Sequence, residues 1–370
     1  MRVFFSSGEA SGDAYAAELI RRLPGCEIEA VAGNKTKSLI GDLVADNSHW
    51  GSIGILESLK VAPRVVHGYR QAVRRLESGT RGVLVPIDYG YMNIRLARRA
   101  KQLGWHVLYF IPPGSWRKDK QGSDLPDITD TIVTPFEWSA EILNKMGANA
   151  HWFGHPLVQM VSQATAESSE RSGIAVLPGS RIHEIASNLP VIAQATQNLQ
   201  ETIRFGVAQS VDEAKLRALW KKVGGGSAEF SSETYSILKS SRAAIICSGT
   251  ATLESALCRC PTIVVYRGNK LMEIEYRIRR PKFDYISLPN ILLNRPILPE
   301  LIQWDASPQT VRQHLDSLLI DGEARSAQLS AFEELASVLG GSHCLDETAK
   351  LILSMKSQGA GNFGSCDRVE

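Results

Sequence analysis

The 370-residue sequence has no long hydrophobic run and no strong net charge of either sign. No stretch approaches the ~18 apolar residues that a membrane-spanning helix needs, and the apolar run at Met1–Ser6 is too short for a signal peptide. The net charge is only +2, so no overall positive field indicates binding to nucleic acid. We therefore expect a cytoplasmic protein whose contact with any membrane is peripheral.

The cysteines are few and lack the spacing of a metal site. None of the six forms a Cys-x-x-Cys pair, and the sequence contains no Asp-x-Asp and no His, Cys and Asp cluster with ligand spacing. We expect neither a metal nor a cofactor, and we interpret most of the cysteines as small core residues in a reducing compartment.

The sequence consists mainly of short apolar runs with residues that favour β-strands, each followed by a stretch typical of a helix. Near-continuous hydrophobic strands that alternate with helices are typical of a parallel sheet covered on both faces. The predicted strands are Val3–Ser6, Ile28–Ala32, Gly82–Asp88, His106–Ile111 and Thr131–Thr134, then Gly173–Leu177, Thr202–Ala208, Ala243–Cys247 and Thr262–Tyr266. The predicted fold class is α/β, with two doubly wound Rossmann-like domains.

A change of composition at His155–Arg171 marks the boundary between the two domains, because a polar run there follows Pro156. We predict domains over residues 1–160 and 161–345, followed at 346–370 by a helix end and a flexible tail rich in Gly and Ser. Ligands of such sheets bind at the carboxyl ends of the strands. We therefore expect the chemistry at strand-to-helix turns, in a cleft between the domains.

Two turns of the first domain are candidates. Ser7–Asp13 follows the opening strand, and its glycines let a ligand approach the backbone. Its spacing is Gly-x-x-x-Gly rather than the dinucleotide pattern, so taken alone it is typical of a tight turn. Asp88 ends a buried strand, where a carboxylate can act as a general base. The alternative for Asp88 is a cap on the following helix.

Two turns of the second domain have the residues of a diphosphate site. In Leu177–Arg181 a Gly turn precedes Arg181, whose guanidinium can hold a phosphate. A cation in the first turn of a helix opposes the helix dipole, so we expect an anion that compensates the charge of Arg181. In Cys247–Glu254, Ser248, Gly249 and Thr250 lead into a helix N-terminus. Glu254 can accept hydrogen bonds from sugar hydroxyls or merely compensate the helix dipole. The pattern of a nucleotide triphosphatase is absent.

Taken together, the motifs resemble those of lipid-A-disaccharide synthase. They occur in the order of that family and span roughly residues 5 to 305. The matching segments are Ser7–Asp13, Ile53–Glu57, Ile87–Asp88, Pro135–Glu137, Gly154–Leu157, Leu177–Arg181, Ser248–Glu254, Ile286–Leu292 and Pro299–Leu301.

The resemblance implies a GT-B fold, two domains facing across a cleft, and a metal-independent inverting hexosyltransferase of lipid A (lipopolysaccharide) biosynthesis. The donor would be UDP-2,3-diacylglucosamine and the acceptor 2,3-diacylglucosamine 1-phosphate (lipid X), giving a β-1,6-linked disaccharide and UDP. Similar enzymes work at the cytoplasmic face of the inner membrane and can form homodimers. The matching positions make Asp88 the candidate base, bring Ser11 and Glu9 to the active site, and assign Arg181 and Asn290 to the nucleotide.

The sequence departs from the family pattern at two places, both in the acceptor-side domain. Tyr89–Asn93 stands where the family usually has Ala-Pro-Asp-Phe-Asn, so Tyr91 replaces a carboxylate. Pro112–Arg117 is a shortened form of a segment with two tryptophans. The departures leave open a GT-B transferase or epimerase with a different partner, and a nucleotide-sugar-binding protein without turnover.

Two basic clusters offer a surface for anionic lipid headgroups or an acyl-sugar phosphate. The first alternates with apolar residues over Val61–Arg75 and contains Arg64, Arg70, Arg74 and Arg75; the second contains Arg277, Arg279, Arg280 and Lys282. The alternative for each cluster is an ordinary solvated helix face. An enzyme with lipid substrates and no spanning helix needs some such surface, so an anionic inner-membrane surface is an expected partner.

Overall fold

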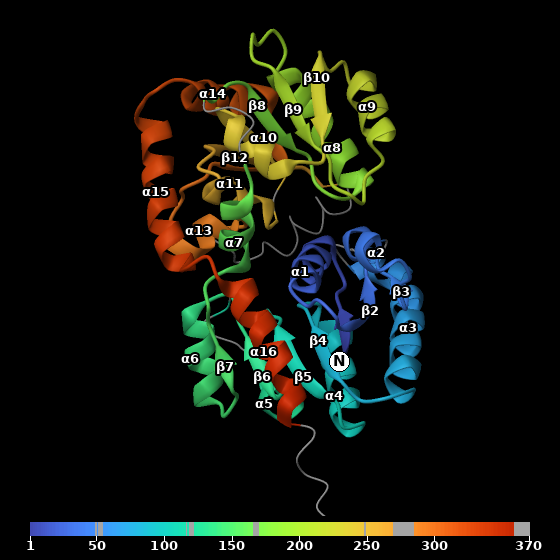
Figure 1. Cartoon of the computed structure of the whole chain (residues 1–370). Helices are drawn as coiled ribbons and strands as arrows, with labels where there is room; N and C mark the ends of the chain where they lie inside the picture. Colours follow the sequence, from blue (N-terminus) through green and yellow to red (C-terminus); the bar gives the residue numbers. More distant parts are fainter. Residues whose placement is uncertain are drawn as a thin grey trace, which may run out of the picture. The chain divides into compact units, whose positions relative to one another are not determined.

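The computed structural model describes residues 1–48, 50, 55–115, 117, 122–165, 170–247, 249–268 and 285–358. The chain divides into two compact units, Met1–Pro156 with Gly341–Glu370, and Leu157–Gly340 (Figure 1). Several positions singled out by the sequence lie outside the described residues: Ile53, Gly54, Trp116, Ser248, the second basic cluster and the tail after residue 358.

The first unit contains a seven-stranded parallel sheet in the order β3-β2-β1-β4-β5-β6-β7. Its strands are β1 (Arg2–Ser6), β2 (Glu27–Ala32), β3 (Ala45–Asp46), β4 (Val83–Pro86), β5 (His106–Phe110), β6 (Thr131–Val133) and β7 (Ala150–His151). Its helices are α1 (Ala10–Arg21), α2 (Asn34–Ile40), α3 (Ile55–Glu77), α4 (Gly90–Gln102), α5 (Leu125–Ile128), α6 (Glu137–Lys145) and α16 (Cys344–Gln358).

Successive residues of these strands serve opposite faces of the sheet, because side chains alternate along a strand. Phe4 and Leu84 belong to the core cluster that also holds Leu76 of α3 and Leu96 of α4. On the other face, Phe110 of β5 meets the ring of Tyr15 from α1 edge to face, with ring centroids 6.1 Å apart. Burial on both faces explains why these strands read as continuous apolar runs.

The second unit contains a six-stranded parallel sheet in the order β10-β9-β8-β11-β12-β13. Its strands are β8 (Ile174–Leu177), β9 (Ile203–Gly206), β10 (Ala228–Ser231), β11 (Ala243–Ile246), β12 (Thr262–Tyr266) and β13 (Glu300–Ile302). Its helices are α7 (Pro156–Gln163), α8 (Ile182–Ala195), α9 (Glu213–Lys222), α10 (Thr234–Ser240), α11 (Ala251–Leu257), α13 (Leu288–Leu293), η1 (Gln303–Asp305), α14 (Pro308–Leu319) and α15 (Glu323–Leu339).

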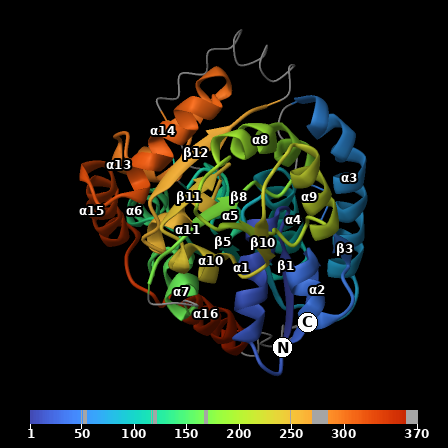
Figure 2. The same cartoon turned by 90° about the horizontal axis from the view of Figure 1, so that it is seen from above.

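This sheet is also covered on both faces, as the α/β prediction requires. Ile174 and Val176 pack with residues of α8, α9 and α14, whereas Ala175 and Leu177 pack with residues of α7, α10 and α11. Figure 2 shows the strands of this unit between these two groups of helices. The predicted α/β fold with two doubly wound sheets is therefore confirmed.

The chain passes between the units twice, after Pro156 and after Gly340. The predicted boundary at 160/161 lies inside α7, and α16 belongs to the first unit, where the Arg22 side chain binds Asp346 with an N···O distance of 2.7 Å. Gly154 has a φ of 89°, and a Cβ there would lie 2.3 Å from the carbonyl oxygen of Gly341. Only glycine fits this close approach of the two segments.

Candidate functional site

Each sheet has one place where the strand order reverses. In the first unit the chain starts at β1, builds outward through β2 and β3, and then returns to place β4 on the other side of β1. In the second unit β8 and β11 flank the same kind of reversal. Open α/β sheets bind their ligands at such a point, beyond the carboxyl ends of the two strands.

In the first unit the two turns predicted from the sequence meet at this point. Ser6 of β1 pairs with Pro86 of β4, so the turns that follow these strands are neighbours. A Cβ at Gly8 would lie 1.9 Å from the ring of Tyr89, and therefore only a glycine allows this contact. The fold thus brings the Ser7–Asp13 turn and Asp88 together.

Asp88 has the protonation behaviour of a general base. The residue is exposed at the surface, but protein atoms displace water around its carboxylate. This loss of water and the charge of Glu9 together raise the pKa from 3.8 to about 6, against the lowering effect of the Tyr89 N–H. The helix α4 begins at Gly90 with Tyr89 as its N-cap residue, so Asp88 does not occupy the capping position that was the alternative.

The other residues of the first turn divide into two kinds. Glu9 is an exposed N-cap residue of α1, and Ser11 is half-buried in the first turn of that helix. Asp13, for which the sequence suggested no role, is buried and accepts hydrogen bonds from the backbone N–H groups of Lys35 and Thr36 at 2.9 and 3.1 Å. Asp13 therefore holds the start of α2 against α1, since its carboxylate satisfies two donors of that helix.

In the second unit the two predicted turns also lie side by side. Leu177 of β8 pairs with Ile246 of β11, and the N–H of Cys247 donates to the carbonyl of Leu177 at 3.0 Å. Gly179 and Gly249 have φ values of 103° and 87°, which favour glycine, and no atom of the described residues would lie within 4 Å of a Cβ at Gly249. Open space in front of a backbone turn suits the approach of a ligand.

Arg181 is the N-cap residue of α8, and its guanidinium lies 3.0 Å from the carboxylate of Glu184. Both side chains are largely shielded from solvent, with 19% and 10% of their area exposed. The anion expected to compensate Arg181 is therefore within the protein, one turn into the helix, and the position of Arg181 does not by itself require a phosphate. What supports Arg181 as a residue that binds the nucleotide is its position beside the strand reversal.

Glu254 and Thr250 lie at the start of α11. Thr250 is the N-cap residue of this helix, and Glu254 is half-buried one turn further on, where it accepts a hydrogen bond of 3.4 Å from the hydroxyl of Tyr235. Gly249 precedes them in the turn. These residues are grouped as the sequence predicts.

Asn290, assigned to the nucleotide side by the resemblance, is buried at the start of α13. Its side chain is 1% exposed, and its amide nitrogen donates to the Leu298 carbonyl and to Glu300, at 2.9 and 2.8 Å. Its amide oxygen accepts from the N–H groups of Ile297 and Leu298, both at 2.8 Å. The donors and the acceptor of this amide are thus engaged inside the protein, so Asn290 supports the segment, and its assignment to the nucleotide side stays a prediction.

Glu300 links two of the motifs that the sequence identified separately. Its carboxylate accepts hydrogen bonds from the backbone N–H groups of Ile286 and Ser287 and from the side chains of Ser287 and Asn290. The motif at Pro299–Leu301 thus fixes the motif at Ile286–Leu292. No periodicity in the sequence could indicate this pairing, because the two segments are joined by side chains rather than by a shared element.

A family model for lipid-A-disaccharide synthetase matches residues 3–350. The chain belongs to this family. It is therefore a glycosyltransferase of lipid A synthesis, as the motifs indicate.

Relatives from distant bacteria match over nearly their whole length. The lipid-A-disaccharide synthase of Gloeothece citriformis is 29% identical over 381 residues, covering 95% of this chain and 99% of the relative. That of Nitrosococcus oceani is 31% identical over 356 residues, covering 90% and 91%.

Solved structures share the fold at low sequence identity. A Staphylococcus aureus MnaA–UDP co-structure has a TM-score of 0.63 at 11% identity and covers 100% of both chains. MurG of Acinetobacter baumannii has a TM-score of 0.56 at 14% identity, covering 96% of this chain and 99% of the other. The GT-B architecture expected from the resemblance is therefore present.

The motif residues Phe136 and His155 lie together in the first unit, with ring centroids 5.7 Å apart. His155 is 5% exposed, and its burial lowers its pKa from 6.5 to about 3, so the ring is neutral at physiological pH. Phe136 also stacks on Trp138 with a centroid distance of 4.5 Å. This cluster forms the base from which the chain passes into the second unit at Pro156.

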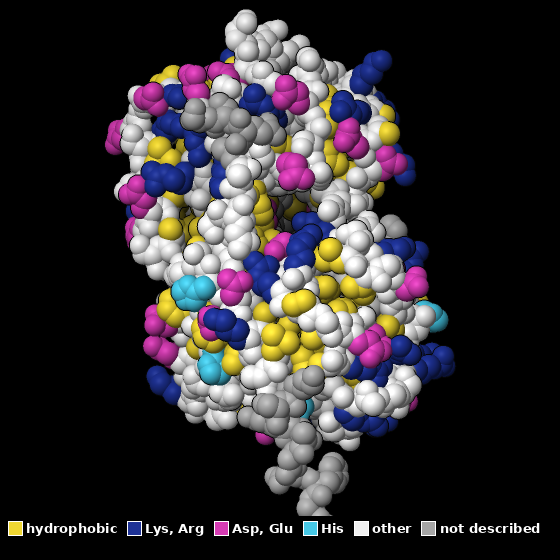
Figure 3. Space-filling view, in the orientation of Figure 1, with side chains coloured by type: hydrophobic (Ala, Val, Ile, Leu, Met, Phe, Trp, Pro, Cys, Tyr) yellow, Lys and Arg dark blue, Asp and Glu magenta, His cyan; other side chains and the backbone are white. Residues whose placement is uncertain are grey.

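The helix α3 carries the first basic cluster on its outer side. Arg64, Arg70 and Arg74 are exposed, and Figure 3 shows basic side chains along the edge that α3 forms. Four of the five apolar residues between them, namely Val61, Val65, Tyr69 and Val73, pack against the core, and only Val66 is largely exposed, at 46%. Among the described residues, no helix is both long and apolar enough to cross a bilayer.

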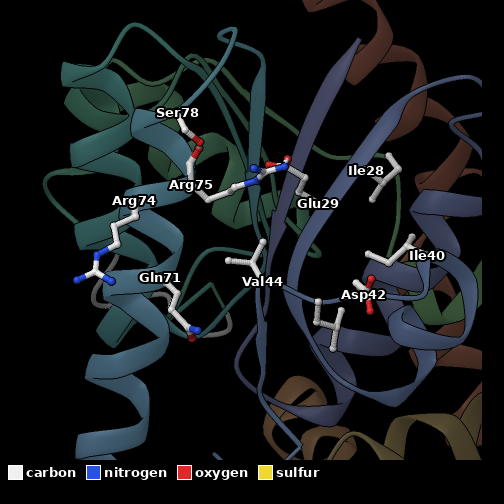
Figure 4. Close-up of a pocket in the computed structure, with 10 residues that line it drawn as sticks. Ile28, Glu29, Ile40, Asp42, Val44, Gln71, Arg74, Arg75 and Ser78 are labelled. Carbon is white, nitrogen blue, oxygen red and sulfur yellow. Dashed lines mark hydrogen bonds and ion pairs between the residues drawn. The ribbon is translucent and has the colours of Figure 1, made fainter.

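A cavity of about 650 Å³ lies between α3 and the edge of the first sheet. Arg74 and Arg75 of the first basic cluster line it, whereas the predicted catalytic and UDP-sugar-binding residues do not. Figure 4 shows Arg75 reaching from α3 toward Glu29 of β2, and the Nε–Oε1 distance is 2.7 Å. Glu29 also binds the buried Arg2 at 2.8 Å. The lining residues are Ile28, Glu29, Ile40, Asp42, Leu43, Val44, Gln71, Arg74, Arg75 and Ser78.

Within the described residues, no group of three or more His, Cys, Asp or Glu side chains is arranged to hold a metal ion.

Proposed function

We propose that this chain transfers 2,3-diacylglucosamine from UDP to 2,3-diacylglucosamine 1-phosphate, with inversion at the anomeric carbon. The products are a β-1,6-linked disaccharide and UDP. The observation that carries the proposal is the grouping of Asp88 and Glu9 at the strand reversal of the first unit, in a chain that belongs to the lipid-A-disaccharide synthetase family.

Asp88 acts as the base in this reaction. Its carboxylate takes the proton of the acceptor 6-hydroxyl while that oxygen forms a bond to the anomeric carbon, and the bond from this carbon to the diphosphate breaks. A pKa of about 6 supports the assignment, because such a group is mostly deprotonated at pH 7 and still basic enough to hold the proton. Ser11, in the neighbouring turn, orients the acceptor.

The second unit holds UDP. Its support is the pair of Gly turns at the strand reversal, together with the solved relatives of similar fold, among them MnaA with UDP and a Neisseria meningitidis epimerase bound to UDP-GlcNAc (TM-score 0.58, 10% identity, covering 96% and 100%). Arg181, Ser248, Gly249 and Thr250 contact the diphosphate, and Glu254 binds sugar hydroxyls. Asn290 contributes only indirectly, through the segment that it supports.

The leaving diphosphate is stabilised without a metal or cofactor. Backbone N–H groups of the Gly249 turn and the guanidinium of Arg181 take the place of a cation, which is electrostatic preorganisation. The enzyme works at the cytoplasmic face of the inner membrane, with the basic side of α3 against anionic headgroups. We also propose that the enzyme forms a homodimer, and the support for this is the family alone.

A second candidate is transfer to a different, non-acylated acceptor. Tyr91, which replaces a carboxylate of the family pattern, is 81% exposed and lies three residues after Asp88. An aromatic ring at this place changes the surface that an acceptor meets.

Mass spectrometry of the products separates the two candidates. Purified enzyme receives acylated or plain UDP-glucosamine derivatives with 2,3-diacylglucosamine 1-phosphate or unacylated glucosamine 1-phosphate. The proposal expects a tetra-acylated disaccharide phosphate and one UDP per disaccharide. A disaccharide formed only with an unacylated acceptor would favour the second candidate. UDP binding without UDP release from any donor–acceptor pair would contradict both candidates.

A further inference from the structure

The backbone at the candidate base is held in an unusual conformation. Asp88 and Tyr89 have φ values of 45° and 48°, so two consecutive residues with side chains lie in the left-handed region. A Cβ in this region crowds the following carbonyl, and such residues persist only where their surroundings hold them. The turn therefore needs partners that prevent it from relaxing.

Two buried side chains supply these partners by binding the carbonyl oxygen of Asp88. The amide nitrogen of Asn93 donates to it at 2.9 Å, and the hydroxyl of Tyr109 donates to it at 2.9 Å. Both side chains are fully buried. Burial raises the pKa of Tyr109 well above its ordinary value, and the charge of Asp88 adds to this effect, so the hydroxyl remains a donor at any working pH.

Asn93 also joins this carbonyl to the neighbouring strand ends. Its amide nitrogen lies 3.0 Å from the carbonyl oxygen of Ser6 and 3.1 Å from that of Ile87, and its amide oxygen accepts from the Ser6 hydroxyl at 2.7 Å. One side chain thus gathers the carboxyl end of β1, the carboxyl end of β4 and the left-handed turn itself. The strand reversal and the candidate base share this single support.

We propose that Asn93 is a positioning residue that fixes the direction of the Asp88 carboxylate, with Tyr109 as its partner. The inference rests on the proposed function of Asp88. A purely structural role would not need the bond to Asp88, because backbone hydrogen bonds already hold the end of β4. The N–H of Ile87 donates to Ser6 of β1, and the N–H of Asp88 donates to Phe110 of β5. The hydrogen bonds from Asn93 and Tyr109 to the Asp88 carbonyl, here called the clamp, in addition hold the turn in its left-handed conformation.

Loss of the clamp lets the turn relax toward the right-handed region, which redirects the Cα–Cβ bond of Asp88. The carboxylate then leaves the acceptor hydroxyl, and its separation from Glu9 changes. The groups that face the carboxylate are Glu9 and the backbone N–H of Tyr89, with the rings of Tyr89 and Tyr109 nearby. Both the rate and its pH dependence should therefore respond to Asn93.

The test compares Asn93→Ala and Tyr109→Phe with wild type in steady-state UDP release over a range of pH. We expect kcat to fall about 10-fold to 100-fold in Asn93→Ala and by a smaller factor in Tyr109→Phe, with KM for both substrates within about two-fold of wild type. The pH midpoint of kcat/KM should differ from its wild-type value in both variants, because the surroundings of the Asp88 carboxylate change. Combined with Asp88→Asn, neither substitution should lower the residual rate further, because each acts through Asp88.

Asn144→Ala is the matched control, since the Asn144 amide also bonds a backbone carbonyl and N–H in the first unit, those of Ala150, at 2.9 and 2.8 Å. It should lower the melting temperature and leave the pH midpoint unchanged. An unshifted midpoint with kcat within two-fold of wild type in Asn93→Ala would overturn the inference. If that variant does not fold, the same result in Tyr109→Phe overturns it. Wild-type enzyme without UDP release would refute the proposed function instead.

Discussion

The Asp88 carboxylate titrates in a setting formed by two separate turns. One turn provides its own backbone and the N–H of Tyr89, which lowers the pKa; the other provides Glu9, which raises it. Loss of water is the largest influence, and the net result of all three is a pKa of about 6. Because the base must be deprotonated to accept a proton, kcat/KM should rise with pH through this value.

Glu9→Gln tests the part played by the second turn. Removal of the negative charge removes a repulsion that disfavours ionised Asp88, so the pKa of Asp88 falls and the midpoint of kcat/KM moves to lower pH, by less than about one unit. The measurement is the pH profile of UDP release, with Glu18→Gln on the far end of α1 as the control. A midpoint that moves to higher pH would contradict the assigned interaction.

Arg181 and Glu184 show how a residue-scale argument from sequence can be incomplete. The cation at the start of α8 does have a compensating anion, but that anion is a carboxylate three residues later. Likewise, the place of Asn290 depends on hydrogen bonds to residues seven to ten positions away. The sequence located these residues near the site, and it could not distinguish a ligand contact from internal support.

Arg181→Ala separates these two roles. If the guanidinium binds a phosphate, UDP affinity measured by calorimetry should fall about 10-fold to 100-fold, because a charge-assisted hydrogen bond is lost. Arg217→Ala is the control, since Arg217 also pairs with a glutamate on its own helix, at 2.7 Å, in the same unit. Equal UDP affinity in wild type and Arg181→Ala would contradict a role of Arg181 in binding the phosphate.

At the scale of elements, the strands that the sequence missed are those at the sheet edges. All nine predicted strands are present, and the missed ones are β3, β7, β10 and β13, which end the two strand orders. Edge strands are covered less completely, so they lack the continuous apolar run by which central strands are identified. β10, for example, has no buried residue, and β3 and β7 have two residues each.

The segment around α13 is stabilised by polar side chains rather than by an apolar stripe. Asn290→Ala leaves the N–H groups of Ile297 and Leu298 and the carbonyl of Leu298 without their partner. Unpaired buried groups are costly, so the free energy of unfolding should fall by about 1–3 kcal/mol. Denaturant unfolding measures this loss; Gln313→Ala, at an exposed position of α14 in the same unit, is the control. A stability equal to that of wild type would contradict the supporting role.

Over residues 61–77, whose side chains the structure describes, the helix α3 packs most of its apolar residues into the core, so charge should be the main attraction of its outer side to a membrane. Replacement of Arg64, Arg70 and Arg74 by glutamate should abolish binding to vesicles that contain anionic lipid, since each basic residue near the surface contributes about 1 kcal/mol. Sedimentation with vesicles measures the bound fraction, and neutral vesicles are the control. Unchanged binding by the triple variant would assign the membrane contact to another surface.

At the scale of the whole molecule, the alternation of strands and helices was sufficient to predict two parallel sheets. It could not predict that the chain returns to the first unit after Gly340, because α16 has the same local pattern as any surface helix. The strand reversals also required the complete strand order, since they are defined by pairs of strands distant in sequence. In β1 and β4, for example, the paired residues Val3 and Val83 are eighty positions apart in the sequence.

Nucleotide binding and transfer should be separate tasks of the two units. Asp88→Ala tests this division most directly, in one experiment that follows UDP release with UDP-2,3-diacylglucosamine and 2,3-diacylglucosamine 1-phosphate while calorimetry records UDP affinity. We expect UDP affinity within about two-fold of wild type and a loss of turnover of at least about 100-fold. Turnover equal to wild type in Asp88→Ala would show that the proton is taken by another group.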